Sequence, residues 1–529
     1  MNPQTPPQDA TTVPESAKAE SSASTPRWVF WLWGLLLIAS VVPIWFVRYQ
    51  PLPDHAEHLA AAAILHHYRD TGFEFSRYYA PSLGLVPYWG YYFSVLLFAF
   101  LVGVDIANRI VLSLYVTGLP IGFALLAKQF GRSPHLGLFL FPLVWNFNFL
   151  IGFTPFCIGL LLIPYALILY DRFCQHPNWA TALAAIVGGV ITFFAHLLPW
   201  GMYIGAAGLV GLCHSERTLR RLLARFSVWL VPVLVGGYVM LHGRGLAMGK
   251  VGRGLSWARR SFGENIRVFY DFVWNGCVGH EDELLIGILI CTFVALFVTA
   301  PKSHKWQLRD LRAEACFLVA VVAYFVLPRS ILQPEYWWGV NIRFATMACA
   351  FAALLIRGPI VGWRRYLLVP VAISGLGFAI DTTHHFRQAA RFAEGFDELA
   401  ELPGHGTRVL MLLSGARHDP EVRQNYLQCY YEMYQVYHGG YMPWNFDGGF
   451  PISYRVRYPA PNWRMMDFDW NKHARYYDYL FVFEGSGGDP RHFFAGHEQQ
   501  VELAGQRGKW TLWRRKEARV DLDNDIPKR

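Results

Sequence analysis

The sequence predicts a mainly α-helical polytopic membrane protein that ends in a small C-terminal α/β domain. Three observations lead to this fold class. Hydrophobic residues make up 53% of the chain and charged residues only 16%, below the roughly 25% that is usual in soluble proteins. Long apolar runs follow one another through the first 380 residues. Beyond residue 381 the pattern changes to short strand-like segments between turn residues.

Twelve apolar runs are candidate membrane helices, because a span needs roughly 20 residues and neighbouring helices allow somewhat fewer. These runs are 28–47, 88–104, 106–127, 135–150, 155–170, 179–195, 198–213, 226–243, 285–300, 314–328, 342–356 and 364–380. The preceding segment 1–26 is rich in Pro, Ser, Thr and Ala, so we expect a disordered cytoplasmic tail. The first run then reads as an uncleaved signal anchor.

Basic residues in the short loops predict the orientation, because lysine and arginine are retained on the cytoplasmic side. Five loops hold most of them: Lys128 with Arg132; Arg172; Arg217, Arg220, Arg221 and Arg225; Lys302, Lys305, Arg309 and Arg312; Arg357, Arg364 and Arg365. All five are cytoplasmic if the N-terminus is inside and one run does not cross. We expect run 88–104, which begins "PYWGYY", to be that interfacial or re-entrant segment. About eleven transmembrane helices remain.

This threading divides the chain into the tail 1–26, a transmembrane domain 27–381 with a first outer loop at 48–87, and an extracytoplasmic α/β domain 382–529. The expected location is the inner (plasma) membrane of a bacterium, with the N-terminus cytoplasmic and the C-terminal domain periplasmic. The net charge of +9 follows from the basic inner loops, and no nucleic-acid-binding pattern accompanies it. We therefore expect the lipid bilayer, and no nucleic acid, as a partner.

The C-terminal domain has clear strand signals. "RVLMLLS" (408–414) and "YYDYLFVFE" (476–484) are apolar and bounded by turn residues, as buried strands are. "QVELAGQRGKWTLWRR" (500–515) predicts a hairpin that turns near Gly505–Gly508. The aromatic stretch 430–450 between the strands has two interpretations: a surface that stacks on sugar rings, or a belt that rests on the membrane.

The first outer loop begins "YQPLPDHAEHLAAAAILHHYRD" (49–70) and places acids and histidines directly after the first helix. Asp54 followed three residues later by Glu57 is a capping-box pattern, so both acids have a purely structural interpretation. The functional interpretation uses the same helix start. A carboxylate in a low-dielectric cleft at the membrane surface can take a proton from a hydroxyl group, and Glu57 or His58 lies close to the same helix face.

The arrangement resembles the GT-C superfamily of glycosyltransferases, which use lipid-phosphate-linked sugars. A short inner tail and a first helix are followed at once by an outer loop with "PLPDHAEHLA", then about ten helices and an outer C-terminal domain. The likeness is greatest to an uncharacterised bacterial branch of this superfamily. The resemblance implies that Asp54 is the catalytic base or a metal ligand. GT-C members often carry another acid in the second outer loop, where this chain has Asn146, Asn148 and Thr154.

Basic residues on the expected outer face are candidate ligands of a donor phosphate. Arg binds phosphate oxygens in pairs, and glycines let backbone N–H groups approach an anion. The glycine-rich loop 242–260 contributes Arg244, Lys250, Arg253, Arg259 and Arg260, although contact with anionic lipid heads explains it equally well. Arg329 and Arg343 flank "QPEYWWGVN", and the GT-C resemblance implies that such a late outer loop supplies a phosphate-binding arginine.

The sequence thus predicts a cell-envelope glycosyltransferase that moves a sugar from a polyprenyl-phosphate donor to a glycan, lipid or protein acceptor on the outer face. Asp54, Glu57 and His58 are the expected catalytic residues, and Asn146, Asn148, His196 and Glu335 the expected acceptor or sugar contacts. No cofactor is certain, and a divalent cation remains an alternative. The alternative function is a non-catalytic transporter or glycan-assembly component with a degenerate GT-C fold.

Overall fold

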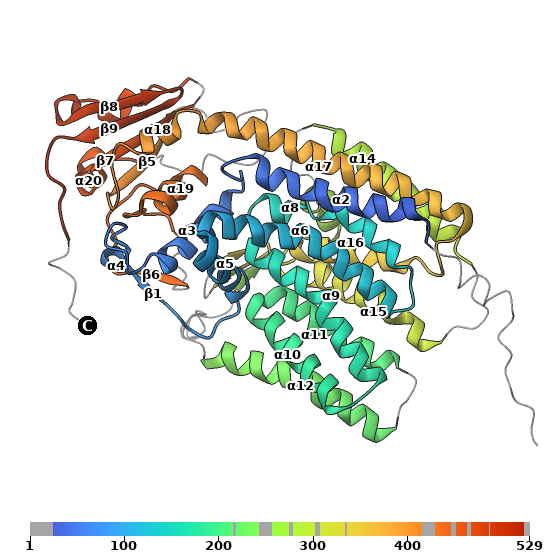
Figure 1. Ribbon diagram of the computed structural model, residues 1–529. Coiled ribbons are helices and arrows are strands. Elements are labelled where there is room, and N and C mark those ends of the chain that lie inside the picture. The colour runs from blue at the N-terminus through green and yellow to red at the C-terminus, as the bar shows by residue number, and fades with distance from the viewer. Residues whose placement is uncertain are drawn as a thin grey trace, which may run out of the picture.

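The computed structural model describes residues 25–214, 218–242, 256–274, 279–301, 307–333, 336–414, 429–445, 451–462, 467–485 and 487–522. Helices form a large bundle, and a small sheet lies beyond one end of it (Figure 1). The helices of the bundle are α2 (Arg27–Phe46), α5 (Trp89–Val102), α6 (Val104–Gln129), α9 (Thr154–Gln175), α10 (Trp179–Ala195), α11 (Leu197–Cys213), α12 (Leu219–His242), α14 (Glu281–Val298), α15 (Arg312–Val326), α16 (Ile342–Ala352) and α17 (Leu368–Ala390).

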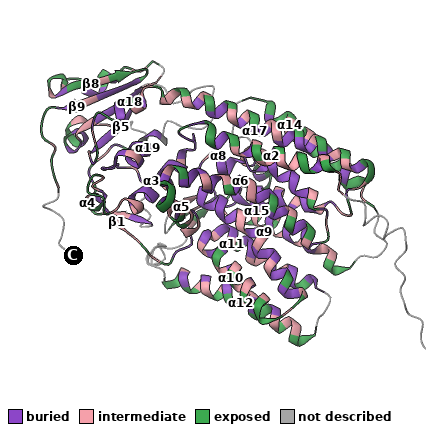
Figure 2. Ribbon diagram, in the orientation of Figure 1, coloured by how far each residue is buried: buried purple, intermediate pink, exposed green. Residues whose placement is uncertain are grey.

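Five helical segments of the described chain are long and apolar enough to cross a membrane. They are Arg27–Phe46, Val104–Gln129, Thr154–Gln175, Leu219–His242 and Gly362–Ala393. Large apolar side chains such as Trp31, Phe100 and Leu241 are exposed on the outside of the bundle, where a soluble protein would carry polar residues (Figure 2). The chain is a membrane protein, as the composition predicted.

Two of the predicted runs, 135–150 and 88–104, do not form long continuous helices. The run at 135–150 was expected to be one helix, and this is wrong: it consists of η1 (Pro134–Phe139), α7 (Leu140–Leu143) and α8 (Phe147–Leu150). The break falls at Asn146, whose side chain caps α8. Helix α5 in run 88–104 has 14 residues, a length of about 21 Å, against the roughly 30 Å of a bilayer core. Since α15 has 15 residues and α16 has 11, this length does not set the run apart, and its interfacial placement stays a prediction.

Arg109 on α6 fixes the point where α2 ends and the first loop begins. Its guanidinium donates to the carbonyl oxygens of Ile44 (3.0 Å) and Val47 (2.8 Å), which are free acceptors at a helix C-terminus. Asp105 pairs with Arg109 at 3.3 Å, at the i, i+4 spacing that brings side chains together on one helix face. The first loop therefore leaves the bundle in a defined direction.

The first loop contains α3 (Pro53–His66), α4 (Phe75–Tyr78) and β1 (Tyr79–Pro81). Helix α3 is buried on most of its surface, because its alanines allow neighbouring elements to approach closely (Figure 2). Two elements from the end of the chain cover it. Strand β6 (Ile452–Tyr454) pairs antiparallel with β1, and α19 (Cys429–His438) packs along α3.

The C-terminal segment holds the strands where the sequence predicted them. β5 (Val409–Ser414) pairs in parallel with β7 (Tyr479–Glu484). β8 (Val501–Arg507) and β9 (Trp510–Arg515) form an antiparallel hairpin, and β9 also pairs with β7. The order of the four-stranded sheet is β5-β7-β9-β8. Gly508 supplies the positive φ of +53° at the turn. Helix α17 continues past residue 381 to Ala390, so the bundle and this segment share a continuous helix.

The remaining described elements connect these parts. Strands β2 (Ser256–Ala258), β3 (Ser330–Gln333) and β4 (Trp337–Trp338) form a small antiparallel sheet. Short helices are α13 (Phe262–Arg267), η3 (Tyr270–Phe272), η4 (Leu308–Leu311), η5 (Ala353–Leu355), η6 (Gly362–Leu367), η7 (Arg391–Ala393), α18 (Phe396–Ala400), α20 (Trp470–His473), η9 (Ala474–Tyr476), η10 (Pro490–Phe494) and η11 (Glu498–Gln500).

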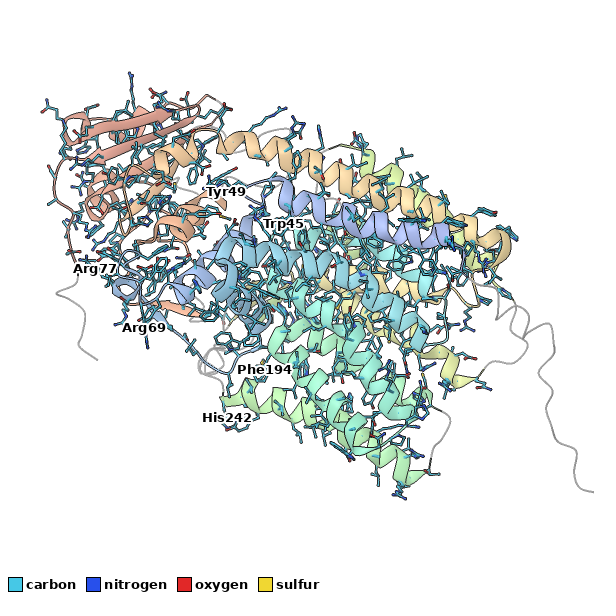
Figure 3. All side chains as sticks on the ribbon, viewed as in Figure 1. Trp45, Tyr49, Arg69, Arg77, Phe194 and His242 are labelled. Carbon is cyan, nitrogen blue, oxygen red and sulfur yellow. The ribbon has the colours of Figure 1, made fainter. Side chains whose placement is uncertain are left out.

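The aromatic stretch after residue 430 forms neither a sugar-stacking surface nor a membrane belt over its described part. Tyr430, Tyr434 and Tyr441 are fully buried. Tyr49, labelled in Figure 3 between the end of α2 and the C-terminal segment, contacts Tyr430 and Tyr437, and its hydroxyl donates to Asp397. These rings are the core between the first loop and the C-terminal segment.

A buried ion pair ties together α9 and α15, and it gives a first test of the fold. Asp171 accepts two hydrogen bonds of 2.8 Å from Arg312 and one of 2.9 Å from His214, and it is fully buried. We expect Asp171→Ala to lower the free energy of unfolding by about 3–5 kcal/mol, because Arg312 would remain buried without a partner. Thermal unfolding of the purified protein in detergent measures this loss.

The matched control is Glu502→Ala, which removes an exposed ion pair with Arg514 at 3.4 Å. This change should cost no more than about 1 kcal/mol, because water and salt screen an exposed pair. Equal losses in the two variants would contradict the placement of Asp171 in the interior.

Candidate active site

The start of helix α3 is held by the backbone and not by a capping side chain. Leu52 is the N-cap residue, Pro53 occupies the first turn, and no side chain caps the helix. The Asp54 N–H donates instead to the Ile151 carbonyl oxygen at 3.0 Å, in the loop between α8 and α9. The predicted capping box of Asp54 and Glu57 is therefore wrong, and both carboxyl groups are released from that structural role.

Gly152 brings the loop between α8 and α9 against this helix start. Its φ is +100°, and a Cβ atom at this position would lie 2.3 Å from the His55 nitrogen. Any side chain here would displace α3. The backbone of Ile151 and Gly152 thus sets the position of Asp54.

Asp54 lies in a partly buried position where only one positive charge acts on it. Burial raises the pKa of Asp54 to about 7, although the guanidinium of Arg343 acts in the opposite direction. Asp54 and Arg343 influence each other without direct contact, since no ion pair joins them. A group placed between them would meet a proton acceptor on one side and a guanidinium on the other.

Arg343 is oriented by its surroundings at the start of α16. Its Nη1 donates to the carbonyl oxygens of Trp338 (2.9 Å) and Gly339 (2.6 Å), and its guanidinium lies 4.0 Å from the ring centre of Phe153. The Nε–H is buried and has no acceptor. Such a donor is costly to leave unpaired, which favours a ligand oxygen in front of it.

Glu57 and His58 lie one turn beyond Asp54. Glu57 is buried, and its pKa is raised mainly by burial and further by the charges of Glu432 and Asp54. His58 Nδ1 lies 2.7 Å from the Tyr92 hydroxyl, and burial lowers the pKa of His58 to about 3. His58 is thus a neutral imidazole that holds Tyr92.

The predicted acceptor contacts differ in whether a polar side-chain atom remains unpaired. Every polar atom of the Asn146 side chain is used: Nδ2 donates to the Tyr115 hydroxyl and the Leu143 carbonyl, and Oδ1 caps α8. Asn148 donates to Thr346 at 2.8 Å, but its Oδ1 is buried and unpaired.

His196 caps α11 through Nδ1, and its ring lies 4.7 Å from that of Tyr88. Its charge interactions with Arg343 and His58 place it beside the same site. Asn148 and His196 therefore remain candidates, whereas Asn146 has no free group.

The predicted phosphate ligands other than Arg343 are placed differently or lie outside the described residues. Arg329 is exposed, and Arg259 is exposed above the Trp257 ring at 5.5 Å. Arg329 acts on Arg260 beside the β2–β3 sheet, whereas the charge interactions of Arg343 are with Asp54, Tyr88 and Cys157. Arg244, Lys250, Arg253 and Glu335 lie outside the described residues.

Sequence reasoning missed Glu432, which α19 brings to the site from the end of the chain. It is fully buried, and its charge acts on Glu57. The available signal was a single acid within "CYYEMYQVYH", a helix whose other residues are mostly apolar or aromatic. Only the packing of α19 on α3 shows where this acid lies.

The described residues include no group of three or more His, Cys, Asp or Glu side chains arranged to hold a metal ion. The acids of the site therefore do not fit the divalent cation considered from the sequence, and no chemical step is assigned to one.

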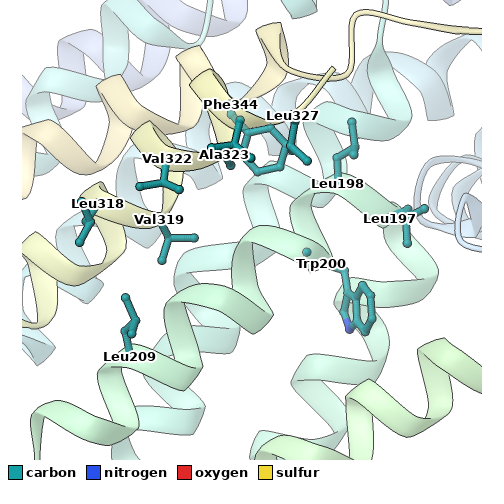
Figure 4. Close-up of a pocket in the computed structure, with 12 residues that line it drawn as sticks. Leu197, Leu198, Trp200, Leu209, Leu318, Val319, Val322, Ala323, Leu327 and Phe344 are labelled. Carbon is teal, nitrogen blue, oxygen red and sulfur yellow. The ribbon is translucent and has the colours of Figure 1, made fainter. Parts of the chain in front are cut away.

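An apolar groove lies between α11 and α15. It has a volume of about 540 Å³ and is lined by side chains such as Leu209, Val319 and Leu327 (Figure 4). Phe344, which follows Arg343 in the chain, lines one end, and Leu197 directly follows His196. Two residues that line the groove are thus the direct chain neighbours of Arg343 and His196.

Comparison with known structures identifies the architecture. ArnT from Cupriavidus metallidurans, a GT-C glycosyltransferase, matches in its apo state with a TM-score of 0.52 and 11% identity, over 92% of this chain and 97% of that chain. The fold is similar to that of ArnT, as the GT-C resemblance led us to expect. The same enzyme bound to undecaprenyl phosphate matches with a TM-score of 0.52 and 11% identity, over 93% and 98% of the two chains.

At this identity the GT-C likeness concerns the fold, and the site must be argued from this chain's own residues. No family model and no curated protein matches the sequence. The resemblance inferred from "PLPDHAEHLA" and the helix arrangement is confirmed at the level of architecture.

The contact at Gly152 gives a direct test of the site geometry. We expect Gly152→Ala to destabilise the protein by clearly more than Gly131→Ala, as measured by thermal unfolding. Both glycines have positive φ, but a Cβ atom at Gly131 would meet no atom within 4 Å. Gly131→Ala should cost about 1–2 kcal/mol for the backbone conformation alone. Equal losses would show that Gly152 does not press on α3.

Proposed function

We propose that this protein transfers a sugar from a polyprenyl-phosphate donor to an acceptor at the outer face of a bacterial inner membrane. The observation that carries the proposal is the pair of Asp54 and Arg343, which face a shared site without touching each other. An apolar groove includes Phe344, the chain neighbour of Arg343. A carboxylate, a guanidinium and an apolar groove are the three parts that such a transfer needs.

Asp54 acts as the general base in this proposal. The acceptor hydroxyl oxygen attacks the anomeric carbon of the sugar, the bond from that carbon to the phosphate oxygen breaks, and Asp54 takes the hydroxyl proton. A pKa of about 7 suits this role, because a base is most effective when its pKa lies near the working pH.

Arg343 binds the phosphate that leaves with the lipid. Its unpaired Nε–H is available to a phosphate oxygen, while its Nη1 is held by two carbonyl groups. Because this donor is oriented before the reaction, it stabilises the negative charge as the bond to the sugar breaks. The partial burial of the site strengthens this electrostatic effect.

The polyprenyl chain occupies the groove between α11 and α15. The groove is lined by leucine, valine, alanine and aromatic side chains, which match an isoprenoid chain in polarity. Phe344 lines the groove and directly follows Arg343 in the chain, which supports a lipid phosphate near this arginine (Figure 4). The match to ArnT with undecaprenyl phosphate bound supports a ligand of this class.

The proposal is tested with purified protein in lipid vesicles and a panel of polyprenyl-phosphate sugars. We expect Asp54→Asn to lower kcat by about 10²–10⁴-fold, because the amide cannot accept the proton. The matched control is Asp70→Asn, beyond the C-terminal end of α3, where the carboxylate accepts the Gly72 N–H at 2.9 Å and lies 3.6 Å from His67. This control should keep wild-type activity.

The same assay over a range of pH identifies the base. Since Asp54 works when ionised, kcat/KM should rise as the pH passes through about 7, and this limb should vanish in Asp54→Asn. Full activity of Asp54→Asn would refute the assignment. A wild-type protein that turns over no donor would favour the non-catalytic alternative.

A further inference from the structure

Glu432 is the most unusual acid in the described structure. It is fully buried, and neither of its carboxyl oxygens has a hydrogen-bond partner. A polar group in this situation costs free energy, and an isolated buried carboxylate costs far more. Helix α19, which carries Glu432, packs along α3 (Figure 1).

The charged groups that face Glu432 are acids. Asp54 and Glu57 on α3 both interact electrostatically with it. The guanidinium groups of this region interact with other partners. Arg343 acts on Asp54, and Arg48 pairs with Asp397 at 2.7 Å and lies over the Tyr437 ring. On another side of α19, His438 contacts His405.

Building on the proposed function, we infer that Glu432 completes the reaction site from the C-terminal segment, and that Glu432 and Glu57 act there as protonated, neutral acids. Asp54, which faces Arg343, is then the single carboxylate of the three. Each neutral acid can donate one hydrogen bond to an oxygen of the sugar or the acceptor and accept another.

The charge of the donor explains why this state is required. A polyprenyl-phosphate sugar carries a negative charge, and three ionised carboxylates beside one guanidinium would repel it. Two neutral acids remove that repulsion and keep their hydrogen-bonding groups. Burial raises the pKa of both Glu432 and Glu57 well above the usual value, which agrees with this arrangement.

Two substitutions distinguish a neutral, hydrogen-bonding Glu432 from an ionised carboxylate and from a residue that only fills space. Glu432→Gln keeps the shape and neutrality of the protonated acid, whereas Glu432→Leu keeps only the bulk. We expect Glu432→Gln to retain kcat/KM within about threefold at pH 7, and Glu432→Leu to lose about tenfold, the value of one hydrogen bond. We also expect the fall in wild-type activity at alkaline pH to move to higher pH in Glu432→Gln.

Infrared spectroscopy tests the protonation state without relying on activity. At pH 7 the wild-type protein should show carboxylic-acid C=O absorption that loses the Glu432 component in Glu432→Gln, keeps the Glu57 component there, and is unchanged in the control Glu502→Gln, an exposed acid. This readout holds even if no donor is turned over. Failure of the proposed function and failure of this inference are therefore distinguishable.

Three results would overturn the inference. An inactive Glu432→Gln with no loss of the acid band would mean that Glu432 works as an ionised carboxylate, for example on a cation. Full activity of Glu432→Leu would reduce Glu432 to packing. An unchanged infrared spectrum in Glu432→Gln would refute the protonated state, even if Glu432→Leu fails to fold.

Discussion

The burial of an acid-bearing helix start is the constraint on which the rest of this structure depends. Helix α3 must be covered so that Asp54 leaves bulk water, yet its first N–H groups still need acceptors. The loop between α8 and α9 meets both needs: the Ile151 carbonyl accepts the Asp54 N–H, and Gly152 allows the close approach. Because the backbone performs this task, the carboxyl group of Asp54 is left for chemistry.

The C-terminal segment contributes to the same burial and is not an independent appendage. Tyr79 in the first loop shows this, since its hydroxyl receives hydrogen bonds from Gln435 (2.7 Å), Asn445 (3.2 Å) and the Met442 N–H (3.0 Å). Together with the β1–β6 pairing, this network holds α19 against α3. It also explains how Glu432, far from Asp54 in the sequence, can lie beside it.

The parts of the fold that follow local patterns were predictable from the sequence. Apolar runs gave most helices, and the strands at 409–414 and 479–484 fell where apolar residues lie between turn residues. The run at 135–150 failed because hydrophobicity cannot distinguish one helix from three short ones, and the cap at Asn146 was not recognised. The capping box failed because a backbone carbonyl from a distant loop took the place of the side chain.

The site was predictable in part, for a similar reason. Asp54 and Arg343 stand out in sequence because each is an ionisable residue beside an apolar run. Glu432 did not stand out, because nothing local shows that α19 reaches α3. Asn146 looked like a sugar contact, but Tyr115 and Leu143 already use its amide. Tertiary contacts between distant segments decide these cases.

The account makes Arg343 the anchor of a lipid phosphate that faces Asp54. A structure of the protein in complex with undecaprenyl phosphate tests this claim most directly. The account predicts the phosphate next to the Nε of Arg343, with the isoprenoid chain in the groove between α11 and α15. A phosphate bound beside Arg260 and Arg329, with that groove empty, would contradict it.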